Sequence, residues 1–227
     1  MMRNSYFFKI YLVLSVAYLI ILFAGYEYFD LFLKPLLIPI IGFGAYFYRK
    51  FPTQNTLITA LIFSWFGDVI LLFTDLGELY FIIGLVCFLI SHIIYCILFN
   101  RQHNIRKKQN KPLFVIGSIL IAFYLIGMVS ILMPFLGDLE VPVILYASVI
   151  SIMILFALNG LLVWKKPGNF IVFSGAFLFI ISDSILAVNK FYAPVPKSSF
   201  FIMLTYLLAQ YLIVVGILKL NPKEIQE

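Results

Sequence analysis

Four ionisable side chains interrupt long apolar runs of this 227-residue sequence: Lys34, Asp68, His92 and Asp183. An Asp near the middle of a membrane-spanning helix costs about 2.5–3.5 kcal/mol on insertion scales, so it needs an internal partner or a cavity. Two carboxyl groups in one low-dielectric site cannot easily both ionise, which prepares one as an acid and the other as a base. We therefore interpret Asp68 and Asp183 as a candidate catalytic pair suited to hydrolysis. The alternative without chemistry is a polar clasp that holds two helices together.

Small and polar residues accompany both aspartates. Ser64 lies one turn before Asp68 on the same helix face, and Gly67 allows a neighbouring helix or a ligand to approach closely. Asp183 directly follows Ser182. These surroundings suit a site between helices, in which Ser64 is a candidate substrate-binding residue.

Further polar side chains in the apolar runs are candidates for lining the same site. His92 and Tyr95 share one helix face, and Tyr206 and Gln210 lie one turn apart. Each pair either hydrogen-bonds neighbouring helices or lines a binding site, and the spacing does not choose between these alternatives.

Two more polar residues lie near the ends of apolar runs. Lys34, followed by Pro35, is placed where a lysine can extend to the lipid headgroups or contact an anionic substrate. Asn189 follows the segment that contains Asp183, where it either terminates a helix or contributes to the site. Both are retained as candidate substrate-binding residues.

The composition predicts that lipid surrounds most of this chain. Hydrophobic residues make up 63% of the sequence and charged residues 11%, and the mean hydropathy is +1.08. No polar stretch is long enough for an aqueous domain, so we expect one membrane domain over residues 1–227. The net charge of +6 is spread over several short loops, which indicates no nucleic-acid partner. Cys87 and Cys96 fall on opposite faces of one predicted helix, so neither a disulfide nor a metal site is expected.

The spacing of the apolar runs predicts an all-α, polytopic membrane helix bundle. A helix that crosses a hydrocarbon core of about 30 Å needs about 20 apolar residues. Eight runs of this length are present, at residues 6–25, 31–48, 56–74, 79–99, 112–133, 141–164, 169–188 and 198–219.

The basic residues predict that both termini are cytoplasmic. With that orientation the inside segments carry 13 Lys and Arg residues and the outside loops carry two, which follows the positive-inside rule. The inside residues are Arg3, Lys9, Arg49, Lys50, Arg101, Arg106, Lys107, Lys108, Lys111, Lys165, Lys166, Lys219 and Lys223, and the outside residues are Lys190 and Lys197. Asp68 and Asp183 then lie at matching depth, because the third and seventh spans run in the same direction.

Several of these segments, taken together and in order, resemble the YhhN-like lysoplasmalogenase family. The match runs from the second to the eighth predicted span. The matching residues are Lys34-Pro35, Phe63-Ser64, Gly67-Asp68, Gly84, Phe88, His92, Tyr95, Ser182-Asp183-Ser184, Leu186-Ala187, Tyr206 and Gln210.

The resemblance implies a membrane hydrolase that acts on a lysophospholipid, and we expect no cofactor or metal. Such an enzyme cleaves the vinyl ether bond of a lysoplasmalogen, releasing a fatty aldehyde and a glycerophospho-ethanolamine or glycerophospho-choline. The resemblance also implies that Asp68 and Asp183 are the central site residues. We expect the protein in a bacterial cytoplasmic membrane.

Two other function classes remain compatible with intramembrane carboxyl groups. An intramembrane aspartyl protease also places two Asp residues on adjacent helices, but its usual Gly-x-Gly-Asp element is absent because residue 65 is Trp. A proton- or cation-coupled transporter is the alternative outside enzymes, since Asp and His are equally natural in ion pathways. Residues 63–68 and 178–183 are faintly similar, which fits a four-plus-four repeat but does not separate a transporter from a hydrolase.

Overall fold

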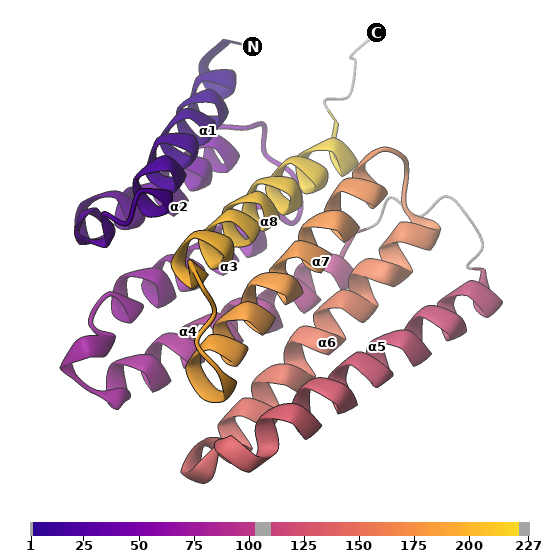
Figure 1. Cartoon of the computed structure of the whole chain (residues 1–227). Coiled ribbons are helices and arrows are strands. Elements are labelled where there is room, and N and C mark those ends of the chain that lie inside the picture. Colours follow the sequence, from indigo (N-terminus) through magenta and orange to yellow (C-terminus); the bar gives the residue numbers. More distant parts are fainter. Residues whose placement is uncertain (1, 103–109, 223–227) are drawn as a thin grey trace, which may run out of the picture. The chain divides into compact units, whose positions relative to one another are not determined.

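The computed structural model describes residues 2–102 and 110–222 of the chain (Figure 1). Within these residues, eight helices are long and apolar enough to cross a membrane, with mean hydropathies between 1.2 and 2.6 over their most apolar stretches. The predicted fold class and number of spans are therefore confirmed, and the chain is an integral membrane protein. The helices are α1 Met2–Phe23, α2 Asp30–Tyr46, α3 Gln54–Leu71, α4 Glu78–Asn100, α5 Lys111–Leu132, α6 Glu140–Val163, α7 Gly168–Ala187 and α8 Ser198–Leu220.

The helix boundaries follow the charged and turn-forming residues within a few positions of the predicted spans. Asp30, Glu78 and Glu140 are the first residues of α2, α4 and α6, where a negative side chain stabilises the positive end of the helix dipole. Asp30 lies one residue before the predicted second span, 31–48, and the structure includes it as the first residue of α2. Asn110 caps α5, because its side-chain oxygen accepts a hydrogen bond from the Leu113 N–H at 3.3 Å.

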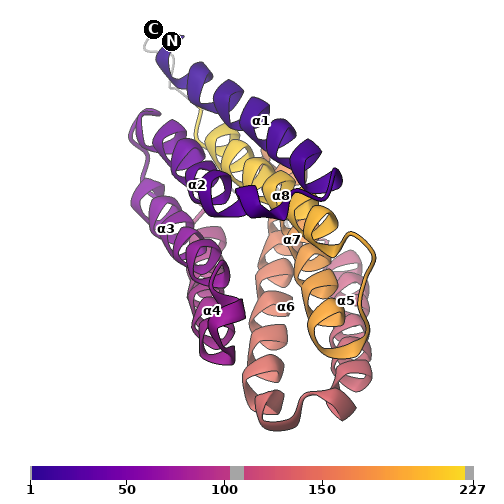
Figure 2. The same cartoon turned by 60° about the vertical axis from the view of Figure 1, so that its left-hand side comes forward.

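The described chain divides into two compact units of four helices each. The first contains α1 to α4 and the second contains α5 to α8, with the division after Arg101. In both units each helix packs against the next one along the chain, as Figure 1 and Figure 2 show for α5, α6, α7 and α8. The expectation that residues 1–227 form one membrane domain stays a prediction.

Glycines bring two helix pairs into close contact, α3 with α4 and α7 with α8. A methyl group at Gly67 of α3 would lie 2.6 Å from the ring of Phe88 on α4. A methyl group at Gly175 of α7 would lie 2.9 Å from the carbonyl oxygen of Ala209 on α8. Small residues allow this approach, which is the usual way to gain packing between helices in lipid. Each unit therefore holds its aspartate helix, α3 or α7, against a close neighbour.

Two prolines inside α2 determine how that helix attaches to α3. Pro39 has no N–H group, so the carbonyl of Pro35, four residues earlier, lacks its usual helical donor. The indole Nε1 of Trp65 on α3 donates to this carbonyl at 2.8 Å. At the other end of α2, the Gln54 side chain donates to the carbonyl oxygens of Ala45 at 2.9 Å and Tyr46 at 3.0 Å. Side chains of α3 thus fasten α2 near both of its ends.

The predicted membrane orientation stays a prediction. Most of the basic loop on which it depends, residues 103–109, lies outside the described residues, as do Arg106, Lys107, Lys108 and Lys223.

Candidate functional site

Asp68 lies near the C-terminal end of α3 and pairs with a lysine of α2. Its Oδ1 is 3.8 Å from the Nζ of Lys34, and the two side chains are 3% and 13% exposed. The pair is fixed next to the Trp65–Pro35 hydrogen bond, because each of those residues lies within one turn of a member of the pair. Asp30, half-buried one turn before Lys34, is also attracted by the lysine. Lys34 was expected to contact headgroups or substrate, and the structure adds a protein carboxylate as its partner.

Asp183 lies on α7 and accepts a hydrogen bond from a tyrosine of α6. The Tyr146 hydroxyl is 2.5 Å from Asp183 Oδ2, the short distance expected when a hydroxyl donates to a carboxyl group. Next to this contact, the hydroxyls of Tyr124 on α5 and Ser184 lie 2.7 Å apart, and Ser184 also donates to the Ile180 carbonyl at 2.6 Å. Hydroxyl groups of α5, α6 and α7 thus bond at Asp183 and at the residue after it.

The two aspartates occupy equivalent places in their own units. Each lies on the third helix of its four-helix unit and pairs with a side chain of the second helix, Lys34 in one unit and Tyr146 in the other. The idea that both carboxyl groups act on one substrate atom stays a prediction.

Ser64 has a partner that favours the helix-bonding interpretation. Its hydroxyl lies 2.8 Å from that of Ser91 on α4, and Ser91 donates to the Ala60 carbonyl on α3 at 2.9 Å. His92 and Tyr95 follow on α4 and are fully buried. The hydroxyl pair therefore joins α3 to α4 directly beside these two candidate residues.

The candidate residues of the second unit fall into two groups. Tyr206 and Gln210 are buried on α8, and the ring of Tyr206 meets that of Phe179 on α7 edge to face, with centroids 5.5 Å apart. Asn189 lies in a π-helical turn, Val188–Tyr192, that continues α7. Its Oδ1 accepts from the Val195 N–H at 2.9 Å, which supports the interpretation that Asn189 terminates this helix and orders the loop before α8.

Two residues that contact the site are absent from the sequence-based candidates, namely Tyr146 and Trp65. Tyrosine and tryptophan are common near the ends of membrane helices, so their presence alone carries little information. For Trp65 a signal exists, because Pro39 exposes the Pro35 carbonyl and a buried indole needs an acceptor. For Tyr146 no such signal exists, since its contact depends on how α6 is rotated against α7.

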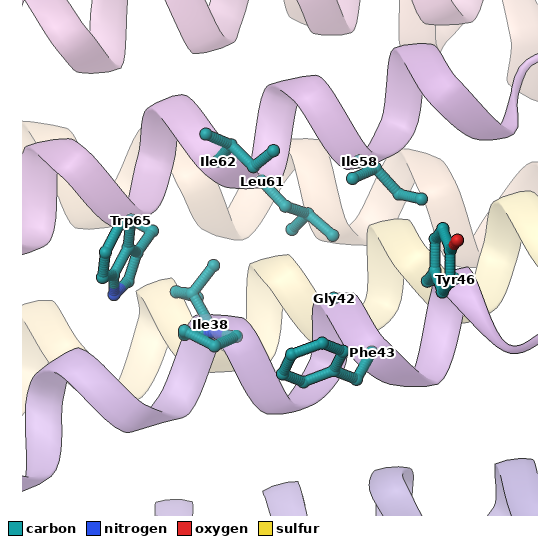
Figure 3. A pocket seen from close by; sticks show the side chains of 9 residues that line it. Ile38, Gly42, Phe43, Tyr46, Ile58, Leu61, Ile62 and Trp65 are labelled. Atoms are coloured by element: carbon teal, nitrogen blue, oxygen red, sulfur yellow. The ribbon is translucent and has the colours of Figure 1, made fainter.

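An apolar groove runs between α2 and α3 (Figure 3). Its volume is about 470 Å³, within the range of ordinary ligand sites. Trp65 lines it near the Lys34–Asp68 pair, and Tyr46 lines it at the C-terminal end of α2. Side chains lining the groove between these ends include Ile38, Phe43, Leu61 and Ile62.

Metal-binding residue types do not gather in the described ranges. Within residues 2–102 and 110–222, no group of three or more His, Cys, Asp and Glu side chains is arranged to hold a metal ion.

Comparison with known proteins identifies a family and curated relatives of this chain. Residues 29–217 match the YhhN family. The chain is 32% identical over 179 residues to the human protein named lysoplasmalogenase TMEM86A, and the alignment covers 77% of this chain and 70% of the relative. The bovine protein of the same name is 30% identical with the same coverage. No solved structure matches.

Proposed function

From the premise that this chain belongs to the YhhN family, as its sequence motifs predicted, we propose that it is an intramembrane hydrolase of lysoplasmalogens. The observation that carries the proposal is that the carboxyl groups of Asp68 and Asp183 lie within apolar helices and are each bound by a polar side chain of a neighbouring helix. The names of the human and bovine relatives supply the substrate class. The reaction is cleavage of the vinyl ether bond.

The chemistry of a vinyl ether requires a proton donor and a proton acceptor. A carboxylic acid first protonates the alkene carbon farther from the ether oxygen, which leaves an oxocarbenium ion. Water then adds to the carbon beside the oxygen while a carboxylate accepts its proton, and the resulting hemiacetal breaks its bond to the glycerol oxygen. One water is consumed, and a fatty aldehyde and a glycerophospho-alcohol are released. Glycosidases handle a similar oxocarbenium-like transition state with two carboxyl groups.

The two different partners favour a division of roles. Lys34 supplies a positive charge beside Asp68, which suits Asp68 to act as the ionised carboxylate that accepts a proton or stabilises the cation. Asp183 accepts a hydrogen bond from a neutral phenol, and a protonated carboxyl group can keep this contact while it holds the proton for the alkene, which suits Asp183 to act as the acid. We therefore assign Asp183 as the acid and Asp68 as the base.

Purified protein in detergent provides the test. It is incubated with a vinyl-ether lysophospholipid, and aldehyde is measured with a coupled dehydrogenase. The matched control substrate is the saturated alkyl ether, which has the same shape but no alkene to protonate. Aldehyde from the first lipid and none from the second is the expected result. If both lipids are recovered intact, the hydrolase proposal fails, and a transport assay across sealed vesicles becomes the next experiment.

A further inference from the structure

We infer that the groove between α2 and α3 binds the single hydrocarbon chain of the substrate and selects substrates by chain length. The inference rests on the proposed function for the identity of the lipid, but the groove itself is a feature of the first unit alone.

Hydrogen bonds hold the groove open at both ends. Near one end Trp65 donates to the Pro35 carbonyl, and at the other Gln54 donates to the carbonyl oxygens of Ala45 and Tyr46. Between these fixed contacts the floor is Gly42, and a methyl group built on it would meet no atom within 4 Å. The groove therefore has free space beside Gly42, between the contacts that join the two helices near the ends of α2.

The lining suits a hydrocarbon chain and no other part of a phospholipid. Its surface is almost wholly apolar, with Ile38, Leu61 and Ile62 on facing helices (Figure 3). A peptide or a headgroup in this place would leave its polar groups without partners, at a cost that a hydrocarbon chain avoids. From Ile38 to Tyr46 the groove follows about 12 Å of helix axis. That length accommodates an extended chain segment.

The position of the groove relative to the charged pair explains which end of the lipid lies where. Trp65 lines the groove three residues before Asp68, and its acceptor Pro35 directly follows Lys34. The vinyl ether is the first group of the lipid chain after the glycerol. A chain that extends from Trp65 toward Tyr46 would hold this group at the Asp68 end and bring the adjacent phosphate toward the Lys34 ammonium, which is opposite in charge.

The first experiment fills the groove at Gly42. Gly42→Phe places a ring in open space, so activity on long-chain lysolipids should fall by about tenfold or more, the scale expected for the loss of a few methylene contacts. Activity on short-chain lysolipids should change little. Gly127→Phe is the matched control, because Gly127 lies on α5 and also has open space where a side chain would start. An unchanged chain-length profile in Gly42→Phe would overturn the inference.

A second experiment does not depend on hydrolysis or on a single variant. The probe is a saturated ether lysolipid with a photoreactive group at the end of its chain. Crosslinks should concentrate on residues 42–46 and 58–62 and should decrease in Gly42→Phe or, if that variant misfolds, in Ile62→Trp. Labelling spread evenly over the helices would contradict the inference that the groove binds the hydrocarbon chain. Labelling confined to the groove in a protein that releases no aldehyde would instead retain the groove and refute the hydrolase proposal.

Discussion

Each four-helix unit has an aspartate on its third helix, but the side chain that contacts the aspartate differs between the units. Asp68 in the first unit pairs with the ammonium of Lys34, and Asp183 in the second accepts a hydrogen bond from the phenol of Tyr146. The helix that supplies the partner also differs, because α2 contains two prolines in its interior and borders the groove.

This difference shows how one helical arrangement can give two carboxyl groups separate tasks. A cation beside Asp68 compensates a negative charge, whereas a phenol beside Asp183 provides one directed hydrogen bond and no charge. If the proposed roles are correct, variants of the two neighbourhoods should fail in different ways.

The largest expected effect comes from removing either carboxyl group. Asp68→Asn and Asp183→Asn should each lower turnover about 10²-fold or more, the usual scale for a general acid or base. Asn keeps the shape and hydrogen-bonding capacity of Asp, so expression and thermal stability should change little. Aldehyde release and thermal unfolding are measured together, with Asp138→Asn in the loop before α6 as the control. Full activity in either variant would remove that aspartate from the mechanism.

The next largest effect is expected from changing Lys34, the charged partner of Asp68. Lys34→Met leaves Asp68 without its counter-ion, so both turnover and lipid binding should suffer, by about tenfold or more in kcat/KM. Lys34→Arg should retain most activity because it keeps the charge. Combining Lys34→Met with Asp68→Asn should lower kcat no further than Asp68→Asn alone, although KM still rises through the lost phosphate contact, and the double variant should be more stable than Lys34→Met. Additive losses would show that the ion pair has no part in the reaction.

Tyr146→Phe tests the neutral neighbourhood, with a smaller expected effect. Losing the hydrogen bond to the Asp183 carboxyl group should reduce kcat by roughly tenfold, and KM should stay constant because the bond is made to the proposed acid and not to the lipid. Tyr124→Phe is the matched control, since it removes a hydroxyl that bonds Ser184, the residue after Asp183. Equal losses in the two variants would argue against a specific role for Tyr146 in positioning Asp183.

Ser64→Ala should give the smallest effect. Its hydroxyl joins α3 to α4 through Ser91, and hydrogen bonds between membrane helices contribute about 0.6 kcal/mol on average. A small loss of thermal stability with activity within a factor of two is the expected outcome. A large rise in KM without any loss of stability would instead restore Ser64 as a substrate-binding residue.

The fold could be predicted from sequence because hydropathy and charge act on each span independently. A run of about 20 apolar residues between charged or turn-forming breaks must cross the membrane as a helix, and neighbouring spans need not be known. The exact helix ends are less predictable, as at Asp30 one residue before the predicted span 31–48, because an acidic residue fits a loop and the first turn of a helix equally well.

The candidate site was predictable only at the level of residue type. Asp68 and Asp183 stand out because a carboxyl group in a membrane-spanning helix is costly, and this can be recognised without knowing which side chain is its partner. Their actual partners depend on which faces of α2 and α6 meet the aspartate helices, and an apolar sequence does not determine that rotation. The groove was not predictable for a similar reason, since it depends on which faces of α2 and α3 meet.

The most direct test of the central claim follows the oxygen of water into the products. Hydrolysis of the vinyl-ether lysolipid is run in water enriched in ¹⁸O, and the glycerophospho-alcohol is analysed by mass spectrometry. Protonation by a carboxylic acid followed by water addition to the oxocarbenium ion predicts that this product carries no label, because its oxygen comes from the original ether. Label in the glycerophospho-alcohol would mean that water attacks the glycerol carbon, and it would contradict the mechanism assigned to Asp68 and Asp183.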